Sequence, residues 1–128
     1  MPLEWYPVPE SGMPQPLSNI FVLDFSTLLP GPMATLMLAE AGADVVKVES
    51  SSRPDGARWG PKAFFDLLNG GKRSATIDLR TSAGVDELRG LILGADVVLE
   101  SSRPRALEHL GLVADHHPSL RAAESLGA

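Results

Sequence analysis

Residues 20–49 read IFVLDFSTLLPGPMATLMLAEAGADVVKVE, and this stretch contains one strand–helix–strand unit. The apolar run at 20–25 predicts a buried strand, and residues 44–49 predict a second one. Between them, residues 31–41 predict a helix that Gly42 closes. Because a helix between two strands lets them pair in parallel, this unit indicates a parallel sheet.

The residues that follow continue the alternation of strands and helices. Apolar and polar residues alternate at 75–79 in a third predicted strand. Thr81 or Ser82 can cap a helix over 82–93, whose apolar residues fall on one face, and residues 97–99 form a fourth predicted strand. The residues themselves therefore predict an α/β architecture with a mostly parallel sheet.

The segment before this pattern differs in composition. Residues 1–16 contain five of the eleven prolines, which remove backbone donors and disfavour helices and central strands. We predict a proline-rich, disordered arm over 1–16 and one α/β unit over 17–128. Trp5 and Tyr6 could dock on a partner, but a mobile tail is the simpler interpretation, and we assign the arm no function.

The first predicted helix is apolar around nearly its whole circumference. From Met33 to Ala41 its clearly polar residues are Thr35 and Glu40. A helix of this kind is usually covered on more than one side. Either the fold is incomplete in this chain, or the helix packs between the sheet and the predicted helix at 82–93.

Composition excludes several classes of protein. The 128 residues carry 11 Lys and Arg against 16 Asp and Glu, a net charge of −5, which does not favour nucleic acid or an anionic membrane as partner. The absence of cysteine excludes disulfides and thiolate metal sites. No apolar run approaches the length of a membrane span, and we expect a cytoplasmic protein.

Two turns after predicted strands can bind a ligand, because ligands of parallel sheets lie beyond the carboxyl ends of the strands. In the first turn, 26–32, Gly31 would let backbone approach a ligand closely, although a plain turn is equally consistent. The second turn, 101–105, has two serines and two arginines at the start of a short predicted helix over 104–111. Guanidinium groups bind phosphate through paired hydrogen bonds, so this turn is the best predicted anion site.

Motifs of other enzyme classes are absent. The stretch 69–74, NGGKRS, resembles a P-loop but has Asp66 where that motif requires glycine. The first turn has one glycine where a dinucleotide-binding fingerprint needs three, although Glu49 lies about where a ribose-binding acid would. The three histidines show no metal-binding spacing, and neither Ser26 nor Ser74 has a recognisable base. We predict no catalytic residue and no metal.

A series of short motifs occurs in order from about Leu17 to Leu112. They are LDFS at 23–26, GP at 31–32, LAEAGADVVKVE at 38–49, NGGKRS at 69–74, DL at 78–79, ADVV at 95–98 and RP at 103–104. In order and spacing they resemble the class III CoA-transferase family, which includes carnitine and formate CoA transferases and α-methylacyl-CoA racemases. The resemblance implies a Rossmann-like, mostly parallel sheet with flanking helices, truncated here, and coenzyme A as substrate.

The resemblance also implies which residues contact coenzyme A. The matching positions are Leu28, Lys72, Ile77, Ser101, Ser102 and Arg103. Two departures affect this site: members often have Asn-Phe or Gly-Tyr at 101–102, and often an arginine at Ser50. Arg53 or Arg105 could compensate for the lost arginine.

The chemistry that the resemblance implies requires residues that this sequence does not match. Transferases of the family attack the acyl-CoA thioester with an aspartate, racemases use a histidine and aspartate pair, and full-length relatives form interlocked homodimers. We therefore expect an amino-terminal fragment that binds acyl-CoA or CoA but lacks the catalytic aspartate and is inactive alone. A racemase fragment and a stand-alone CoA or nucleotide-binding module remain alternatives, and a dehydrogenase fragment is disfavoured.

Overall fold

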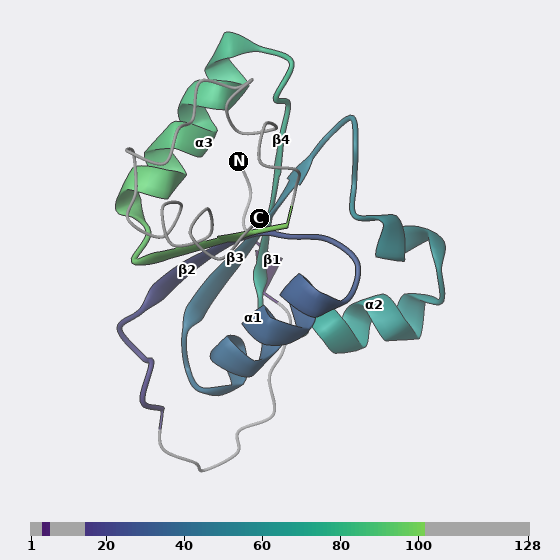
Figure 1. The fold of residues 1–128 in the computed structure, drawn as a ribbon, viewed down its shortest axis with the longest axis vertical. Coiled ribbons are helices and arrows are strands. Elements are labelled where there is room, and N and C mark those ends of the chain that lie inside the picture. The colour runs from purple at the N-terminus through teal and green to yellow at the C-terminus, as the bar shows by residue number, and fades with distance from the viewer. Residues whose placement is uncertain (1–3, 6–14, 102–128) are drawn as a thin grey trace.

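A five-stranded sheet forms the centre of the computed structural model, which describes residues 4–5 and 15–101 (Figure 1). The strands lie in the order β1-β4-β3-β2-β5. The elements in chain order are β1 (Glu4–Trp5), β2 (Phe21–Phe25), α1 (Pro30–Glu40), β3 (Asp44–Ser50), η1 (Gly56–Trp59), α2 (Lys62–Asn69), β4 (Arg73–Ile77), α3 (Ser82–Gly94) and β5 (Val97–Glu100).

Four of the five strands are parallel, as predicted. β2 pairs with β3 on one side and with β5 on the other, β3 pairs with β4, and only β1 is antiparallel, at the β4 edge. The chain thus moves outward from β2 to β4 and then returns to the opposite side of β2 with β5. This reversal creates a switch point between β2 and β5, where ligands of Rossmann-like sheets bind.

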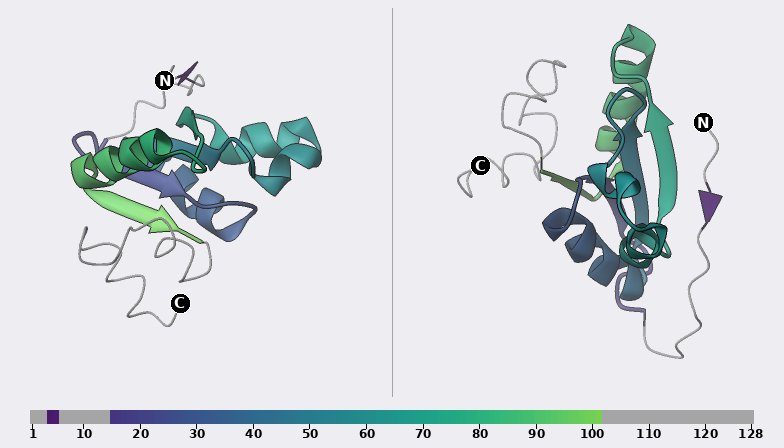
Figure 2. Two further views of the ribbon diagram at one scale, coloured as in Figure 1. Left: turned by 90° about the horizontal axis from the view of Figure 1, so that it is seen from above. Right: turned by 90° about the vertical axis from the view of Figure 1, so that its right-hand side faces the viewer.

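Alternating residues of the strands form two separate cores. On one face, Leu23 and Val46 pack with Leu88 and Ile92 of α3. On the other face, Val22 joins Val45 and the partly buried Leu38 and Ala39 of α1. The sheet therefore lies between α1 and α3 (Figure 2). The alternative that the first helix packs against the helix at 82–93 is wrong, because the sheet separates them.

α3 begins where the sequence predicts. The hydroxyl of Thr81 accepts a hydrogen bond from the Gly84 N–H at 3.0 Å, which satisfies one of the unpaired donors of the first helical turn. Of the two predicted caps, Thr81 takes this role and Ser82 is the first helical residue.

Three described elements have no counterpart in the sequence prediction. These are the short helices η1 and α2, between β3 and β4, and the two-residue strand β1. β1 belongs to the predicted arm, and its Glu4 and Trp5 pair with Ser74 and Arg73. The rest of the arm and the predicted helix at 104–111 lie outside the described residues.

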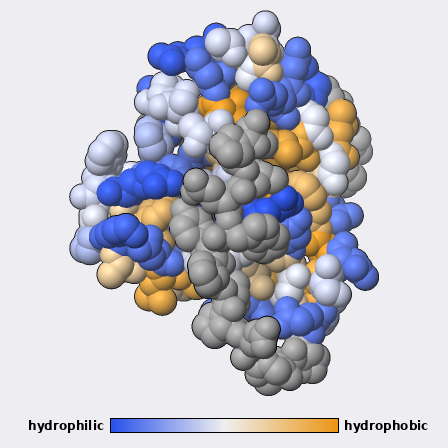
Figure 3. Space-filling view, turned by 180° about the vertical axis from the view of Figure 1, so that it is seen from behind, coloured by the Kyte–Doolittle hydropathy of each residue, from blue (hydrophilic) through white to orange (hydrophobic). Residues whose placement is uncertain are grey.

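An apolar surface remains uncovered on α1, η1 and α2. Met33 and Met37 lie one turn apart on α1 and are exposed, and so are Trp59, Phe64 and Leu67. Seen from behind, apolar surface lies on the side of the molecule where α2 is found (Figure 3). Part of the nearly all-apolar circumference of α1 is therefore uncovered within residues 15–101.

Candidate functional site

A cavity of about 460 Å³ lies at the carboxyl ends of the parallel strands. It is lined by Phe25, Thr27, Leu28, Val48, Glu49, Ser50, Arg53, Pro54, Gly56, Leu79 and Ser101. Residues from β2 and from just beyond β5 meet there, so the cavity includes the switch point of the sheet. Its volume falls within the range usual for small-molecule sites.

Leu28 forms part of the wall in an unusual backbone conformation. Its φ is +68°, the one positive φ of a non-glycine residue among those described. Left-handed backbone costs a residue with a side chain about 1–2 kcal/mol, because Cβ approaches a carbonyl oxygen. The Leu28 N–H donates to Asp55 Oδ1 at 2.9 Å.

Asp55 is fully buried and carries a charge that Lys47 balances. Its Oδ2 lies 2.7 Å from Lys47 Nζ, and Oδ2 has no hydrogen bond in addition to this ion pair. Burial alone would raise the pKa of Asp55. Lys47 and the N–H groups of Ala57 and Leu28 outweigh burial, so the pKa lies below its ordinary value and Asp55 is ionised.

Glu49, at the end of β3, is a second buried carboxylate at the cavity. It accepts hydrogen bonds from Arg58 Nη2 at 2.7 Å, Arg58 Nε at 2.8 Å and the Asp55 N–H at 2.9 Å. Burial opposes ionisation, but Arg58 and the backbone donor outweigh it and lower the pKa of Glu49. Because three donors occupy its oxygens, Glu49 serves the structure of the loop and is poorly suited to act as nucleophile or base.

Arg53 differs from every other cation of residues 15–101. Each of the other lysines and arginines there lies within 4 Å of a carboxylate, whereas Arg53 is exposed at the cavity and has no ion pair with a described residue. A guanidinium without a carboxylate partner at the wall of a cavity can bind a phosphate.

Ser101 connects the two sides of the switch point. Its Oγ accepts a hydrogen bond from the Thr27 N–H at 3.2 Å, so the chain after β5 is tied to the chain after β2. Of the predicted contact residues, Leu28 and Ser101 line the same cavity. The structure therefore brings these two together across 73 positions of sequence; their contact with coenzyme A stays a prediction.

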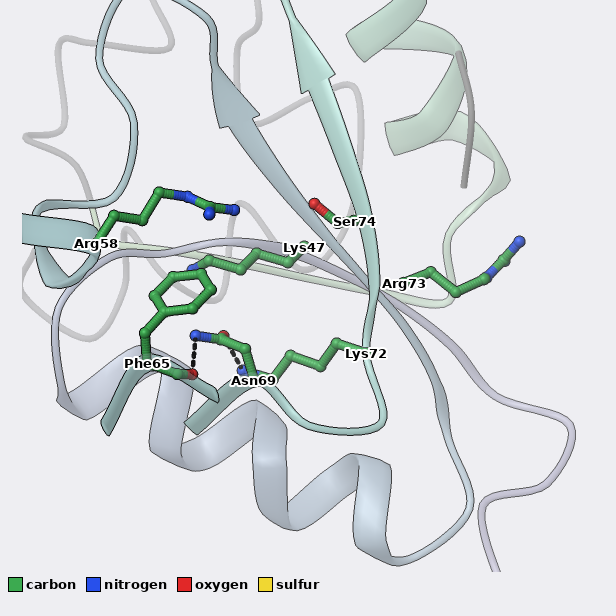
Figure 4. A pocket seen from close by; sticks show the side chains of 7 residues that line it. All are labelled: Lys47, Arg58, Phe65, Asn69, Lys72, Arg73 and Ser74. Carbon is green, nitrogen blue, oxygen red and sulfur yellow. Dashed lines mark hydrogen bonds between the residues drawn. The ribbon is translucent and has the colours of Figure 1, made fainter. Parts of the chain in front are cut away.

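Lys72 lies in the interior rather than at the cavity. Its Nζ donates to Pro32 O at 2.9 Å and Asn69 Oδ1 at 3.0 Å, and lies 3.4 Å from Asp24 Oδ2. In Figure 4 its side chain points toward Asn69, while Arg73 points the other way. Burial lowers the pKa of Lys72 to about 8, although Asp24 opposes this. In this arrangement Lys72 joins α1, α2 and β2.

Of the three remaining predicted contact residues, the structure describes one, Ile77. Ile77 is buried at the end of β4, in the core under α3, and does not line the cavity. Ser102 and Arg103 lie outside the described residues, so the anion site predicted at 101–105 stays a prediction.

Gly31 contacts protein instead of a ligand. A Cβ at this position would lie 2.3 Å from Ser26 Cβ and 2.4 Å from Ser26 Oγ, so the absent side chain makes room for Ser26. Packing against Ser26 therefore accounts for a glycine at position 31 without a ligand that approaches the backbone there. The start of α1 is also poor in donors, because Pro30 and Pro32 have no N–H.

Sequence reasoning missed the buried charges that support the cavity. Lys47, Asp55 and Arg58 come from a strand, a loop and a short helix, and their pairing requires distances that spacing does not give. The one available signal was that Lys47 and Glu49 are ionisable residues among the valines of 45–49, the interior of β3. Such residues are rarely buried without partners.

Metal and membrane features are absent from the part of the chain that the structure describes. No group of three or more His, Asp or Glu side chains there could hold a metal ion. None of the described helices has the length and apolar character needed to cross a bilayer.

Known proteins resemble this chain over most of its length. The sequence profile of CoA-transferase family III matches residues 17–122. A formyl-CoA:oxalate CoA-transferase of Escherichia coli O6:H1 is 37% identical over 111 residues, which are 81% of this chain and 27% of that enzyme. The enzyme of the same name from Shigella boydii serotype 18 is 36% identical over the same shares.

Solved structures agree with this match. A CAIB/BAIF family protein from Brucella suis superimposes with a TM-score of 0.73 at 37% identity, over 86% of this chain and 31% of that one. A hypothetical protein from Mycobacterium tuberculosis gives a TM-score of 0.73 at 38% identity, over 85% and 30%. The chain belongs to CoA-transferase family III, which confirms the resemblance. It spans about 27% of the length of the curated relatives that it matches.

Proposed function

We propose that this chain carries part of the coenzyme A site of a transferase that moves coenzyme A between an acyl-CoA and a carboxylic acid. The observation that carries the proposal is the cavity at the switch point between β2 and β5, in a member of CoA-transferase family III. The similar formyl-CoA:oxalate CoA-transferases support a transferase rather than a racemase.

The lining of the cavity fits the nucleotide half of coenzyme A. Phe25, Leu28 and Leu79 offer apolar surface to an adenine ring, and Ser50 and Ser101 offer hydroxyls. Arg53 supplies a cation that no described carboxylate neutralises, which suits a phosphate group. Arg53 would thus take the place of the arginine that family members often have at Ser50.

The described residues are suited to binding rather than to bond breaking. The cavity's one carboxylate among them, Glu49, accepts three hydrogen bonds within the protein. We propose that the aspartate of the transferase reaction comes from outside residues 15–101, and that these residues alone do not turn over acyl-CoA. Incubation with formyl-CoA and oxalate, followed by chromatography of CoA esters, tests this.

Isothermal titration with coenzyme A tests the binding proposal. We expect saturable binding by the wild-type chain and weaker binding by Arg53→Ala, by about 10- to 100-fold, because a hydrogen bond to a charged group contributes about 1.5–3 kcal/mol. Arg89→Ala is the matched control, since Arg89 pairs with Asp86 on α3, outside the cavity. Arg103→Ala tests the sequence prediction in the same experiment.

The titration can also contradict the proposal. If the folded wild-type chain shows no heat of binding with coenzyme A, the proposal that it carries part of the coenzyme A site is wrong. Equal weakening by Arg53→Ala and Arg89→Ala would indicate a general effect of charge and no phosphate contact at Arg53. Repeating the titration with pantetheine, which lacks the nucleotide, shows which half of coenzyme A contributes.

A further inference from the structure

One buried ion pair, Lys47–Asp55, makes two hydrogen bonds to the backbone of the loop after β2. Lys47 Nζ donates to the Ser26 carbonyl oxygen at 3.0 Å and lies 2.7 Å from Asp55 Oδ2. Asp55 Oδ1 accepts from the Leu28 N–H at 2.9 Å. The pair therefore contacts backbone polar groups on both sides of Thr27, the Ser26 carbonyl and the N–H of the left-handed Leu28.

Asp55 is itself fixed by its neighbours. Its N–H donates to Glu49 Oε2 at 2.9 Å, and its Oδ1 also accepts from the Ala57 N–H at 2.9 Å. The Asp55 side chain is fully buried, so water cannot replace its protein donors. Buried hydrogen bonds to a charged acceptor are among the stronger ones in proteins, so this acceptor can hold a strained backbone.

Leu28 forms part of the wall of the cavity. Its side chain is 56% exposed, although leucine is usually buried, and it lines the cavity with Gly56 beside it. A Cβ at Gly56 would lie 3.1 Å from Leu28 Cδ2, so the glycine leaves room for this orientation. Relaxation of Leu28 to a negative φ would redirect its side chain and change the wall.

We propose that the Lys47–Asp55 pair is a positioning device, which holds Leu28 in left-handed backbone and thereby sets the wall of the ligand cavity. The pair acts through Leu28, since neither Lys47 nor Asp55 lines the cavity. The identity of the ligand, the nucleotide half of coenzyme A, rests on the proposed function. The positioning itself is a property of the ligand-free protein and can be measured there.

Hydrogen exchange in the ligand-free protein tests the positioning. We expect the Leu28 amide to be protected in the wild-type chain and to exchange at least tenfold faster in Asp55→Ala, while the core amide of Val46 changes much less. Asp86→Asn, on the surface of α3, is the control. Asp55→Leu, which is similar in size and also lacks the acceptor, replaces Asp55→Ala if the latter does not fold. Equal acceleration of Leu28 and Val46, or none at Leu28, would overturn the proposal.

Two substitutions of Leu28 separate the effect of its backbone conformation on coenzyme A binding from the effect of its side chain. Leu28→Ala and Leu28→Gly remove the same wall, but only glycine adopts a positive φ without strain. With Asp55 present, we expect the two variants to bind coenzyme A within about twofold of each other. With Asp55→Ala, we expect Leu28→Gly to bind at least fivefold more tightly than Leu28→Ala. Equal affinities in the Asp55→Ala background would overturn the proposal.

The two experiments distinguish failure of this inference from failure of the proposed function. If the wild-type chain does not bind coenzyme A, the proposed function is wrong, and exchange of the Leu28 amide still decides whether Asp55 holds this backbone. If coenzyme A binds but Asp55→Ala changes neither amide exchange nor affinity, the proposed function holds and the proposed role of the Lys47–Asp55 pair is wrong.

Discussion

At the scale of single residues, the buried polar groups decide how the first turn is built. Asp24 accepts hydrogen bonds from the hydroxyls of Ser26 and Thr35, and Lys72 Nζ lies 3.4 Å away. All four side chains are buried, so each requires its partners. This cluster places the turn after β2 and the start of α1 before any ligand arrives.

Gly31 is the residue of this turn that should tolerate substitution least. Gly31→Ala brings Cβ within 2.3 Å of Ser26 Cβ, and overpacking of this kind costs about 1–3 kcal/mol. Gly90→Ala, on α3 with no atom within 4 Å, is the control and should raise stability by about 0.5–1 kcal/mol. Urea unfolding measures both. Equal effects of the two substitutions would contradict the close packing at Gly31.

Lys72 gives the protein a pH dependence on the alkaline side. Burial lowers its folded pKa to about 8, against an ordinary value near 10.5, so the folded state releases its proton first as pH rises. The unfolded state then binds more protons, and the free energy of unfolding should increase from about pH 8 to 10.5. Urea unfolding across this interval measures the slope.

The control for Lys72 is a residue that stays charged. Lys72→Arg should remove the alkaline increase in stability, because a guanidinium remains protonated throughout the interval. Lys72→Met should remove it too, because methionine carries no proton that the folded state could release. An unchanged slope in both variants would mean that another group produces it.

At the scale of elements, a local signal predicted α3 and none predicted α2. α3 has a cap, an apolar face and 13 residues. α2 has eight residues and a Pro61 N-cap without a side-chain hydrogen bond, and it contacts η1 and α1. Helices this short are marginal by themselves, so tertiary packing decides whether they form.

The cap of α3 contributes measurable stability. Thr81→Ala removes the acceptor of the Gly84 N–H and should lower the free energy of unfolding by about 1 kcal/mol. Thr81→Ser keeps a hydroxyl and should retain most of it. Thermal unfolding compares the variants, and a Thr81→Ser variant as unstable as Thr81→Ala would show that the methyl group, and not the hydroxyl, is needed.

At the scale of the whole molecule, buried carboxylates should determine stability in acid. The folded pKa values of Asp55 and Glu49 lie below the ordinary range. As pH falls below about 5, the unfolded state therefore takes up protons first, and the free energy of unfolding decreases. The contribution is fully present above this pH and is lost as pH falls through the folded values.

Substitutions identify the groups responsible for the acid effect. Asp55→Asn and Glu49→Gln should each flatten the decrease between about pH 5 and 2, because a neutral amide does not take up this proton. Asp86→Asn, on the exposed face of α3, provides the comparison. Urea unfolding at several pH values gives the slopes. Variants with the wild-type slope would place the acid effect in other carboxylates.

The parallel strands, α1 and α3, and the edge of the sheet where Leu28 and Ser101 lie could all be predicted from the sequence. These follow from periodicity, capping and the direction of parallel strands, all of which are local or depend on chain order. Family membership also followed from short motifs in order. Contact with coenzyme A at these residues is still a prediction.

Which side of α1 is buried depends on tertiary contacts that the sequence does not reveal. Its polar Thr35 faces the interior, while its apolar Met33 and Met37 are exposed. A helix that is apolar all round contains no signal for its orientation, and here the hydrogen bond from Thr35 to Asp24 fixes it. Likewise, the sequence does not show that Lys72 is buried or that Arg53 forms no ion pair within residues 15–101, because burial and pairing depend on distances between segments far apart in the chain.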